Sequence, residues 1–441
     1  MHKSTIFVLA LLVSSIEGAD VLKYVSLKGN AGAYLEGYNA RGIEARRPKN
    51  TSRVWLSFTP SFSFYGLLLG LKCDLYLTDE QKFATQSINR YSFSPSWSWG
   101  TFYLGDFSPS FTNLTMGGIP IKGYGVDLHP GRFRFFIING VAQEASEDSL
   151  ERAFKRDLLG VKLGMGGVSI NVVKAKDDIS SLRDAGDVMP QENLVLSLST
   201  DFSIHKLKLK GEVGTSAHTR DTRSPSFDEM EIPAFVKQVF TPRHSTRFDY
   251  AYRIGAGTPI PFGQFKLSWC YVGPGFTSLG LSQTSNDRNE WKADIMIKPH
   301  RAVSVRANFG EKRDNLIGEK LATTKKRNTM LQVNLIPSRV FMLSGNYQRN
   351  EIQKNTELDT MSFNNLIENF GILQGFNFEF KGTSQSLQMN LSYQQGRNRN
   401  PSVGTPETRT LTYNITHSTR FKFPLSLNLG FFRTDFSVDK E

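Results

Sequence analysis

Three lysines alternate with two leucines over residues 206–210, a spacing that could attract negatively charged groups. In an extended chain alternate side chains point to the same side, so these ammonium groups would form one row. A row of fixed positive charge attracts anions, and rings of Lys or Arg in a pore favour anions. Two more basic residues occupy matching positions of later alternating segments, so the candidate pore-lining set is Lys206, Lys208, Lys210, Arg253 and Lys266.

The same basic residues also fit a purely structural role. Acidic residues are about half as numerous as basic ones on the strand face that carries these lysines. Some could pair with a basic neighbour: Asp249 with Arg247 or Arg253, and Asp294 with Lys292. A wall of cross-strand ion pairs would only keep this face wet and ordered. Structural pairing and anion selectivity therefore both remain open.

A period of two recurs along most of the chain and indicates the elements that carry these lysines. Residues 383–395 place Leu387, Met389, Leu391 and Tyr393 on one side and Gln, Asn and Ser on the other. Similar runs occupy 67–77, 265–271, 376–380, 411–415 and 421–431. Strands of about 10 residues that alternate apolar and polar are what a membrane-spanning barrel requires. No apolar run past the N-terminus reaches the ~18 residues of a spanning helix, so any membrane would be crossed as strands.

Tight turns and long polar stretches alternate between the predicted strands. We therefore predict an all-β fold, a transmembrane antiparallel meander β-barrel of about 18–22 strands with short periplasmic turns and long external loops. Long loops would cover residues 216–245, 273–290, 311–327 and 350–372, among others, and helical spacing predicts a short loop helix over 144–155. The strand list has about 21 members, whereas single-chain barrels have even numbers. Either one strand is false, or the chain is incomplete relative to a larger barrel.

Two segments rich in Gly and Pro stand apart from this rhythm. They are Tyr103–Pro109 with its return Gly117–Val126, and Tyr271–Gly280 with the following Asn286–Trp291. Such a density of Gly and Pro indicates fixed turns, either ordinary ones or a loop folded into the lumen as a constriction or plug. The candidate residues of this motif are Asp106, Gly273, Pro274, Gly275 and Asp287.

The N-terminus has the composition of a secretory signal. A short basic start is followed by an apolar stretch from Ile6 to Val13 and by small residues up to Ala19. This order of regions is typical of a signal peptide. We therefore expect residues 1–19 to direct export and residues 20–441 to form the barrel in the outer membrane.

Composition and motif searches exclude several classes of function. The chain of 441 residues has a net charge of +12, but export and the absence of basic runs interleaved with aromatics argue against nucleic acid. Its seven His and two Cys show no metal-ligand spacing, and no nucleophile elbow, P-loop or dinucleotide fingerprint occurs. We predict no enzyme, no metal and no cofactor, and we expect Cys73 and Cys270 to be unpaired.

Several of these segments, together with Gly125–Phe135 and Pro190–Leu194, resemble the large porin-like outer-membrane barrels of Gram-negative bacteria. The resemblance covers about half of the mature chain and implies a surface location and a barrel fold. It transfers no substrate, because no ligand motif matches. One segment around Asp106 is also similar to fimbrial ushers, but the chain lacks room for an usher's soluble domains and has no recognisable TonB-dependent plug domain.

Two functions follow from these expectations. The first is porin-like passage of small solutes, anionic ones if the basic rows line the pore. The alternative is a non-conducting platform for binding, export or assembly that acts through its long loops. The expected partners are outer-membrane lipid and either small solutes or an unknown protein.

Overall fold

A computed structural model describes residues 25–39, 50–64, 67–78, 89–147, 152–227, 239–283, 286–356, 362–398, 406–423 and 425–439. The expected signal peptide, residues 1–19, lies outside the described residues. Among the residues described, no helix is both long enough and apolar enough to cross a bilayer.

The described chain is built almost entirely of strands. The first nine are β1 (Val25–Asn39), β2 (Asn50–Phe64), β3 (Leu67–Thr78), β4 (Arg90–Trp97), β5 (Gly100–Phe107), β6 (Ile121–Leu128), β7 (Phe133–Gln143), β8 (Lys155–Met165) and β9 (Val168–Asp178). A short 3-10 helix, η2 (Ile179–Ser181), leads to β10 (Glu192–Ile204), β11 (Leu207–Thr219), β12 (Thr246–Ile260), β13 (Gly263–Val272), β14 (Arg288–His300) and β15 (Val303–Arg313). The last six are β16 (Ala322–Leu335), β17 (Phe341–Thr356), β18 (Phe363–Phe380), β19 (Thr383–Asn398), β20 (Glu407–Arg420) and β21 (Ser426–Asp439).

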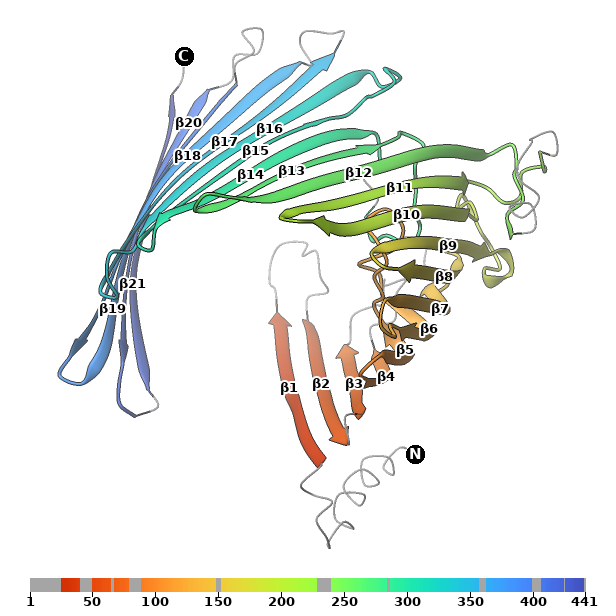
Figure 1. The fold of residues 1–441 in the computed structure, drawn as a ribbon, viewed down its shortest axis with the longest axis horizontal. Helices are drawn as coiled ribbons and strands as arrows, with labels where there is room; N and C mark the ends of the chain where they lie inside the picture. Colours follow the sequence, from red (N-terminus) through yellow and green to blue (C-terminus); the bar gives the residue numbers. More distant parts are fainter. Residues whose placement is uncertain are drawn as a thin grey trace, which may run out of the picture. The chain divides into compact units, whose positions relative to one another are not determined.

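These strands form an antiparallel meander. The 21 strands of the described residues belong to one sheet. From β1 to β9, and again from β12 to β21, consecutive strands pair antiparallel, and Figure 1 shows them following one another in chain order. The predicted all-β meander is confirmed, and each observed strand corresponds to one predicted from alternation.

The chain divides into two compact units. Unit 1 comprises residues 1–196, 218–246 and 278–282, and unit 2 comprises 197–217, 247–277 and 283–441. The connection between β13 and β14 therefore contributes residues to both units. Each unit is described by itself below.

Register separates two faces in unit 2. Residues paired across antiparallel strands share a face, and one such row runs through Leu331, Tyr347, Phe370, Tyr393 and Leu411. Leu331 and Phe370 are 42% and 48% exposed, although both are large and apolar. We call this apolar side the outer face and the opposite, polar side the inner face. A row of exposed apolar side chains with no protein cover is what contact with hydrocarbon requires.

Unit 1 shows the same division. Phe135, Leu163 and Ile170 form one paired row on the outer face, and each is more than a third exposed. The opposite side chains of the same strands, such as Phe136, Ile138 and Val173, are buried. The inner face of unit 1 is therefore covered, and the segments that cover it are described in the next subsection.

The strands of unit 2 run further than predicted. We expected loops over 311–327 and 350–372, but β16 begins at Ala322, β17 continues to Thr356 and β18 begins at Phe363. Backbone hydrogen bonds between strands do not depend on apolar side chains, so a strand can continue where both of its faces are polar. Such a stretch shows no alternation of apolar and polar residues, and the sequence therefore does not reveal it. The outer face there carries ion pairs instead: Lys325 and Arg327 lie 3.1 and 2.9 Å from Glu311.

Two local predictions were wrong. Of the helix expected over 144–155, the described residues 144–147 and 152–155 form no part, because Ser146 and Ala153 exchange backbone hydrogen bonds of 2.9 and 3.0 Å in an antiparallel bridge. Helical spacing is weak evidence in a short polar segment, where two strand ends can pair instead. The turn expected at Ser203–Ile204 lies at His205–Lys206, with His205 at φ 55°. Lys206 is therefore a turn residue rather than part of a strand row.

Gly105 is the last paired residue of β5 in the ladder between β4 and β5, where it is in register with Ser92. Its φ is +90°, and a Cβ there would lie 2.1 Å from the carbonyl oxygen of Tyr91. The neighbouring Asp106 accepts a hydrogen bond of 2.7 Å from the backbone N–H of Tyr91. Only glycine allows this close approach, so the carboxylate of Asp106 completes a ladder that the irregular backbone leaves open.

We therefore expect Gly105→Ala to destabilise the folded protein by about 1–3 kcal/mol through backbone strain. Gly345→Ala is the matched control, because nothing lies within 4 Å of a Cβ at Gly345 in strand β17. Thermal and denaturant unfolding followed by circular dichroism would measure both. Equal stability of the two variants would contradict the role assigned to Gly105.

Candidate functional site

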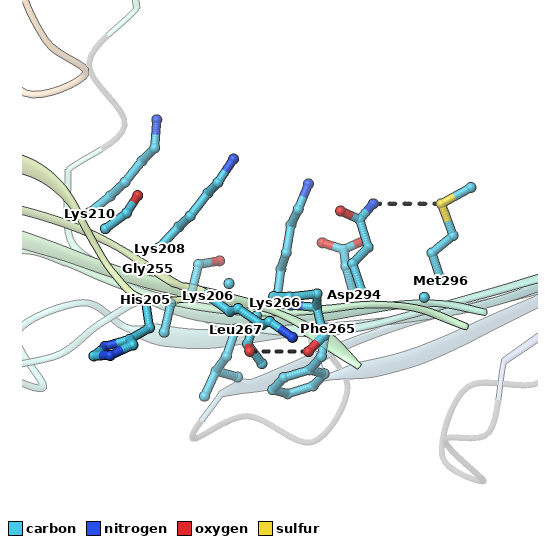
Figure 2. Close-up of a pocket in the computed structure, with 18 of the residues that line it drawn as sticks. His205, Lys206, Lys208, Lys210, Gly255, Phe265, Lys266, Leu267, Asp294 and Met296 are labelled. Atoms are coloured by element: carbon cyan, nitrogen blue, oxygen red, sulfur yellow. Dashed lines mark hydrogen bonds between the residues drawn. The ribbon is translucent and has the colours of Figure 1, made fainter. Parts of the chain in front are cut away.

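A basic hollow lies on the inner face of unit 2. It has a volume of about 1060 Å³ and is lined by β10, β11, β12, β13 and β14 and their turns. Figure 2 shows Lys208, Lys210 and Lys266 projecting from one side of the sheet, whereas Phe265 and Leu267 point to the other. Lys208 and Lys210 of β11 thus lie on the same side of the sheet as Lys266 of β13, and whether they line a pore stays a prediction. We call this site the basic hollow.

Glycines on the intervening strand create the hollow. Gly257 of β12 pairs with Lys266 of β13, which in turn pairs with Asp294 of β14. Two residues earlier, Gly255 also lines the hollow, and the nearest atoms to a Cβ built there are 3.9 Å away. Because these two glycines have no side chain, the space between the lysines of β11 and Lys266 of β13 is left open. We call Gly255 and Gly257 the glycine floor of the hollow.

The charges in the basic hollow do not cancel. Lys210 lies 2.9 Å from Asp201, and the two side chains are 70% and 64% exposed. Neither Lys208 nor Lys266 forms an ion pair with any described residue within 4.0 Å. Exposed ion pairs contribute little to stability, so the pair of Lys210 and Asp201 does little to hold the strands together. The lining contains five lysines and two aspartates, so its formal charge is positive.

Of the other two predicted basic residues, Lys206 lines the hollow from the β10–β11 turn, whereas Arg253 lies outside it. Arg253 pairs with Cys270, on the same face as Lys266 and Gly257. It stands four residues before Gly257, which corresponds to about 13 Å along the strand, and it does not line the hollow. Lys206 extends from the turn and lies apart from the three parallel lysines (Figure 2). Sequence spacing could not show this, because it did not locate the turn.

In unit 1, the connection between β5 and β6 covers the inner face. Phe111 and Met116 are 6% and 0% exposed and pack in one core with Phe136, Ile138 and Val173 from the strands. The segment is a closed loop, since the N–H of Phe111 donates to the carbonyl oxygen of Met116 at 3.0 Å. It is also tied to the wall, because Lys162 of β8 donates to the carbonyl oxygen of Phe111 at 2.9 Å.

A second segment of unit 1, residues 278–282 of the β13–β14 connection, packs on the first. The N–H of Gly117 donates to the carbonyl oxygen of Gly280 at 3.0 Å, and the hydroxyl of Ser278 donates to the carbonyl oxygen of Thr115. The N–H of Leu279 donates to the side-chain oxygen of Asn193 on β10 at 3.0 Å. Two segments far apart in sequence thus form a fixed layer on the inner face of unit 1, which we call the inserted layer.

The predicted Gly-Pro-Gly motif shapes the start of this connection within unit 2. The carboxylate of Asp249 accepts a hydrogen bond of 2.7 Å from the N–H of Gly275. A Cβ at Gly273 would lie 2.1 Å from the same carboxylate, so this position requires glycine. Pro274 accepts a hydrogen bond of 2.8 Å at its carbonyl oxygen from the side chain of Asn286. The motif is a tight turn, and residues 278–282 follow it in the same connection.

Asp287 joins two connections of unit 2. Its side chain is 3% exposed and accepts hydrogen bonds from the N–H groups of Asn315 and Leu316 at 3.0 and 2.8 Å, and from the ammonium of Lys320. Burial acts to raise the pKa of the Asp287 carboxyl, but Lys320 and the two N–H donors outweigh it and hold the pKa below its ordinary value. We call these four residues the Asp287 latch.

Asp106 stands apart from both inserted segments. It lies on β5 in register with Lys122, on the face opposite to Tyr103 and Phe107, whose rings belong to the covered side. Its carboxylate serves the β4–β5 ladder, as described above.

Three polar anchors, Lys162, Asn193 and Asp249, were not recognised in the sequence as loop-holding residues. One signal for the covered face was available. In residues 133–138 five of six are Phe or Ile, and an apolar character on both faces of a strand predicts cover on both faces.

Among the described residues, no group of three or more His, Cys, Asp or Glu could hold a metal ion. Cys73 and Cys270 are both free thiols, as expected. The polar groups that line the hollow are lysine ammonium groups, the imidazole of His205, the carboxylates of Asp201 and Asp294, and amide and hydroxyl groups.

Comparison with known proteins gives similar folds at low identity. No protein-family model matches the chain, and no curated protein sequence matches it. Among solved structures it is similar to OccK2 (OpdF) of Pseudomonas aeruginosa, solved with glucuronate (11% identity, TM-score 0.39, 80% of this chain and 96% of that chain). It is also similar to the outer membrane protein OprD of Pseudomonas aeruginosa (11%, 0.38, 79% and 91%) and to an anion-selective porin from Comamonas acidovorans (14%, 0.32, 74% and 89%). All three TM-scores are below 0.5, so the function proposed below rests on this chain's own residues.

The Asp287 latch predicts a dependence on pH. Because the folded pKa is lowered, the latch is complete above the ordinary carboxyl pKa of about 3.9 and weakens as the pH falls through the lower folded value. Asp287→Asn should speed hydrogen exchange at the amides of Asn315 and Leu316 roughly 10-fold to 100-fold near neutral pH, the loss expected for charged hydrogen bonds. Exchange corrected for its intrinsic pH dependence would measure both effects.

Glu319→Gln is the control for this experiment, because Glu319 is exposed in the same connection. It should leave exchange at both amides unchanged. Undiminished protection in Asp287→Asn would show that the carboxylate does not hold the two connections together.

Proposed function

We propose that residues 20–441 form an outer-membrane β-barrel that lets small anionic solutes pass, and that residues 1–19 direct its export. The exposed apolar rows on the outer faces support contact with lipid, and the polar inner face of unit 2 supports a wet interior. No catalytic role is assigned to any residue.

The observation that carries this proposal is the unpaired charge of the basic hollow. Lys208 and Lys266 project over a glycine floor and form no ion pair with the described residues. A lysine whose only role was structural would be expected to contact a carboxylate, as Lys292 does with Glu290 at 2.6 Å. Fixed, accessible ammonium groups on a pore wall raise the local concentration of anions.

The inserted layer supports a narrow passage rather than a wide one. Its peptide groups are bonded to the wall and to each other, and its apolar side chains are buried, so it does not behave as a loose loop. A fixed layer on the inner face of unit 1 reduces the space available to a solute. We assign it the role of a size filter.

The alternative, a non-conducting platform, requires long loops that are free to bind a partner. The β13–β14 connection, which we expected to serve this purpose, instead uses its residues for the Gly-Pro-Gly turn, the inserted layer and the Asp287 latch. The described ends of the β11–β12 connection are also held together, since Ser245 donates to the carbonyl oxygen of Asp221 at 2.9 Å. Passage of solutes is therefore the better supported function.

Anion selectivity can be tested by removing the two free lysines. At about 6 Å in water, one unit charge contributes about 0.7 kcal/mol, or roughly threefold in local anion concentration. We expect Lys208→Gln with Lys266→Gln to lower the chloride-to-potassium permeability ratio by about tenfold per lysine, since each charge acts about threefold on the anion and about threefold in the opposite sense on the cation, and by less at high salt because of screening. Reversal potentials of single channels in a potassium chloride gradient measure this ratio.

Lys381→Gln is the matched control, since it removes the same charge from the β18–β19 turn, outside the hollow. It should shift the reversal potential little. A cation-selective native channel, or a double variant with unchanged selectivity, would overturn the anionic assignment. Folded protein that conducts no ions would overturn passage itself.

A further inference from the structure

The inner face of unit 2 has a second sector with different chemistry. We define the amide sector as the inner-face residues of β16 to β20, at alternate positions of 328–334, 342–352, 365–377, 384–398 and 408–418. None of these described positions holds Asp, Glu, Lys or Arg, in a chain of which 21% is charged. Asn, Gln, Ser and Thr predominate instead. Charged residues of the same face lie only at the margins of the sector, at Lys326, Lys354, Glu379 and Arg420.

The amide sector is continuous across strands. One row pairs Gln348 with Asn369, Asn369 with Gln394, and Gln394 with Thr410. Another runs through Asn334, Ser344, Leu373, Asn390 and Asn414. Neighbouring strands are about 4.8 Å apart and successive inner residues about 6.8 Å apart. The result is a lattice of amide and hydroxyl groups spaced on the scale of one sugar ring.

Several of these amides have unused hydrogen-bonding capacity. Asn346, Gln388, Asn390 and Gln394 are exposed, and their side chains form no hydrogen bond with the described residues. Each carboxamide offers an acceptor and two donors in one plane. That pattern matches adjacent hydroxyl groups, each of which both donates and accepts. Amides also release water more readily than charged groups do, so binding to them costs less desolvation.

Exposed aromatic rings continue two rows of the lattice. Phe432 of β21 pairs with Asn414, and Phe436 pairs with Thr410, so both rings lie on the same face as the amide sector. They are 68% and 63% exposed. The face of an aromatic ring carries negative charge density and attracts the polarised C–H groups on the flat side of a sugar. Rings beside amides are suited to a saccharide.

The need to keep the inner face hydrated does not by itself account for the lack of charge in the amide sector. Elsewhere on the inner face of the same unit, charged pairs are used, as in Glu290 with Lys292 and Asp294 with Arg306. Those pairs attract or repel any ion that passes. A surface without charge cannot select by charge, and it can select only by hydrogen-bond geometry and shape.

From this juxtaposition we propose that the amide sector, with Phe432 and Phe436, is a binding surface for neutral saccharides. The proposal rests on the proposed passage of solutes and specifies a second solute class for the same wall. Anions would follow the basic hollow, and hydroxyl-rich solutes would follow the amide sector.

Maltotriose is the probe for this proposal. In planar bilayers it should block ion current through the native protein, and in detergent it should bind by calorimetry. Asn390→Leu with Gln394→Leu keeps side-chain size but removes both amides, so the half-blocking concentration should rise about tenfold, as for two ordinary hydrogen bonds. Phe432→Ala should raise it as well. Tetraethylene glycol dimethyl ether, which has no hydroxyl group, should not block.

Gln374→Leu is the matched control, because Gln374 lies on β18 on the outer face, in register with Met389. It should leave the block unchanged, and circular dichroism checks that every variant is folded. Unaltered block in the folded Asn390/Gln394 variant, or an equal loss in Gln374→Leu, overturns the proposal. A conducting channel that does not bind maltotriose overturns it while passage stands. Calorimetric binding without conductance supports it while passage fails.

Discussion

The antiparallel backbone ladder determines where every side chain of this protein lies. Strands β18 and β19 pair residue for residue from Asn365–Asn398 to Phe380–Thr383 without a register shift. Because side chains alternate along each strand, a slip of one residue would exchange the outer and inner faces. The apolar rows, the basic hollow and the amide sector are therefore three consequences of one register. A register error that disrupted one of these three surfaces would disrupt the other two as well.

A second constraint concerns backbone groups away from the ladder, which must find partners wherever they are buried. The connections that fold onto the strands meet this need with side chains from the wall. Lys162 and Asn193 bind peptide groups of the inserted layer, while Asp249 and Asp287 bind those of the β13–β14 connection. Each anchor is a single polar residue on or beside a strand, so the loops are positioned by the sheet.

The strands could be predicted from the sequence because one apolar and one polar face give a strand a period of two, and the two lysines of β11 could be placed in a row for the same reason. Lys206 could not be placed, because a shift of the turn by two residues is invisible in a polar segment. The ends of β16 and β17 beyond the apolar band were missed, because both faces of the strands are polar there, around Lys325 and Arg349. The anchors Asn193 and Asp249 were missed because their partners are 86 and 26 residues away, and spacing alone does not reveal such contacts.

The outer face of β17 and β18 changes from rings to charges within one pair of residues. The rings of Tyr347 and Phe370 lie 4.8 Å apart, and the next outer positions are Arg349 and Glu368, with the Tyr347 hydroxyl donating to Glu368 at 2.9 Å. If the protein shifted by about 7 Å along the membrane normal, either the charged side chains would enter the hydrocarbon core or the aromatic rings would enter water. In a bilayer of different thickness, the lipid would therefore have to stretch or compress around the wall, since the wall itself has one favourable depth.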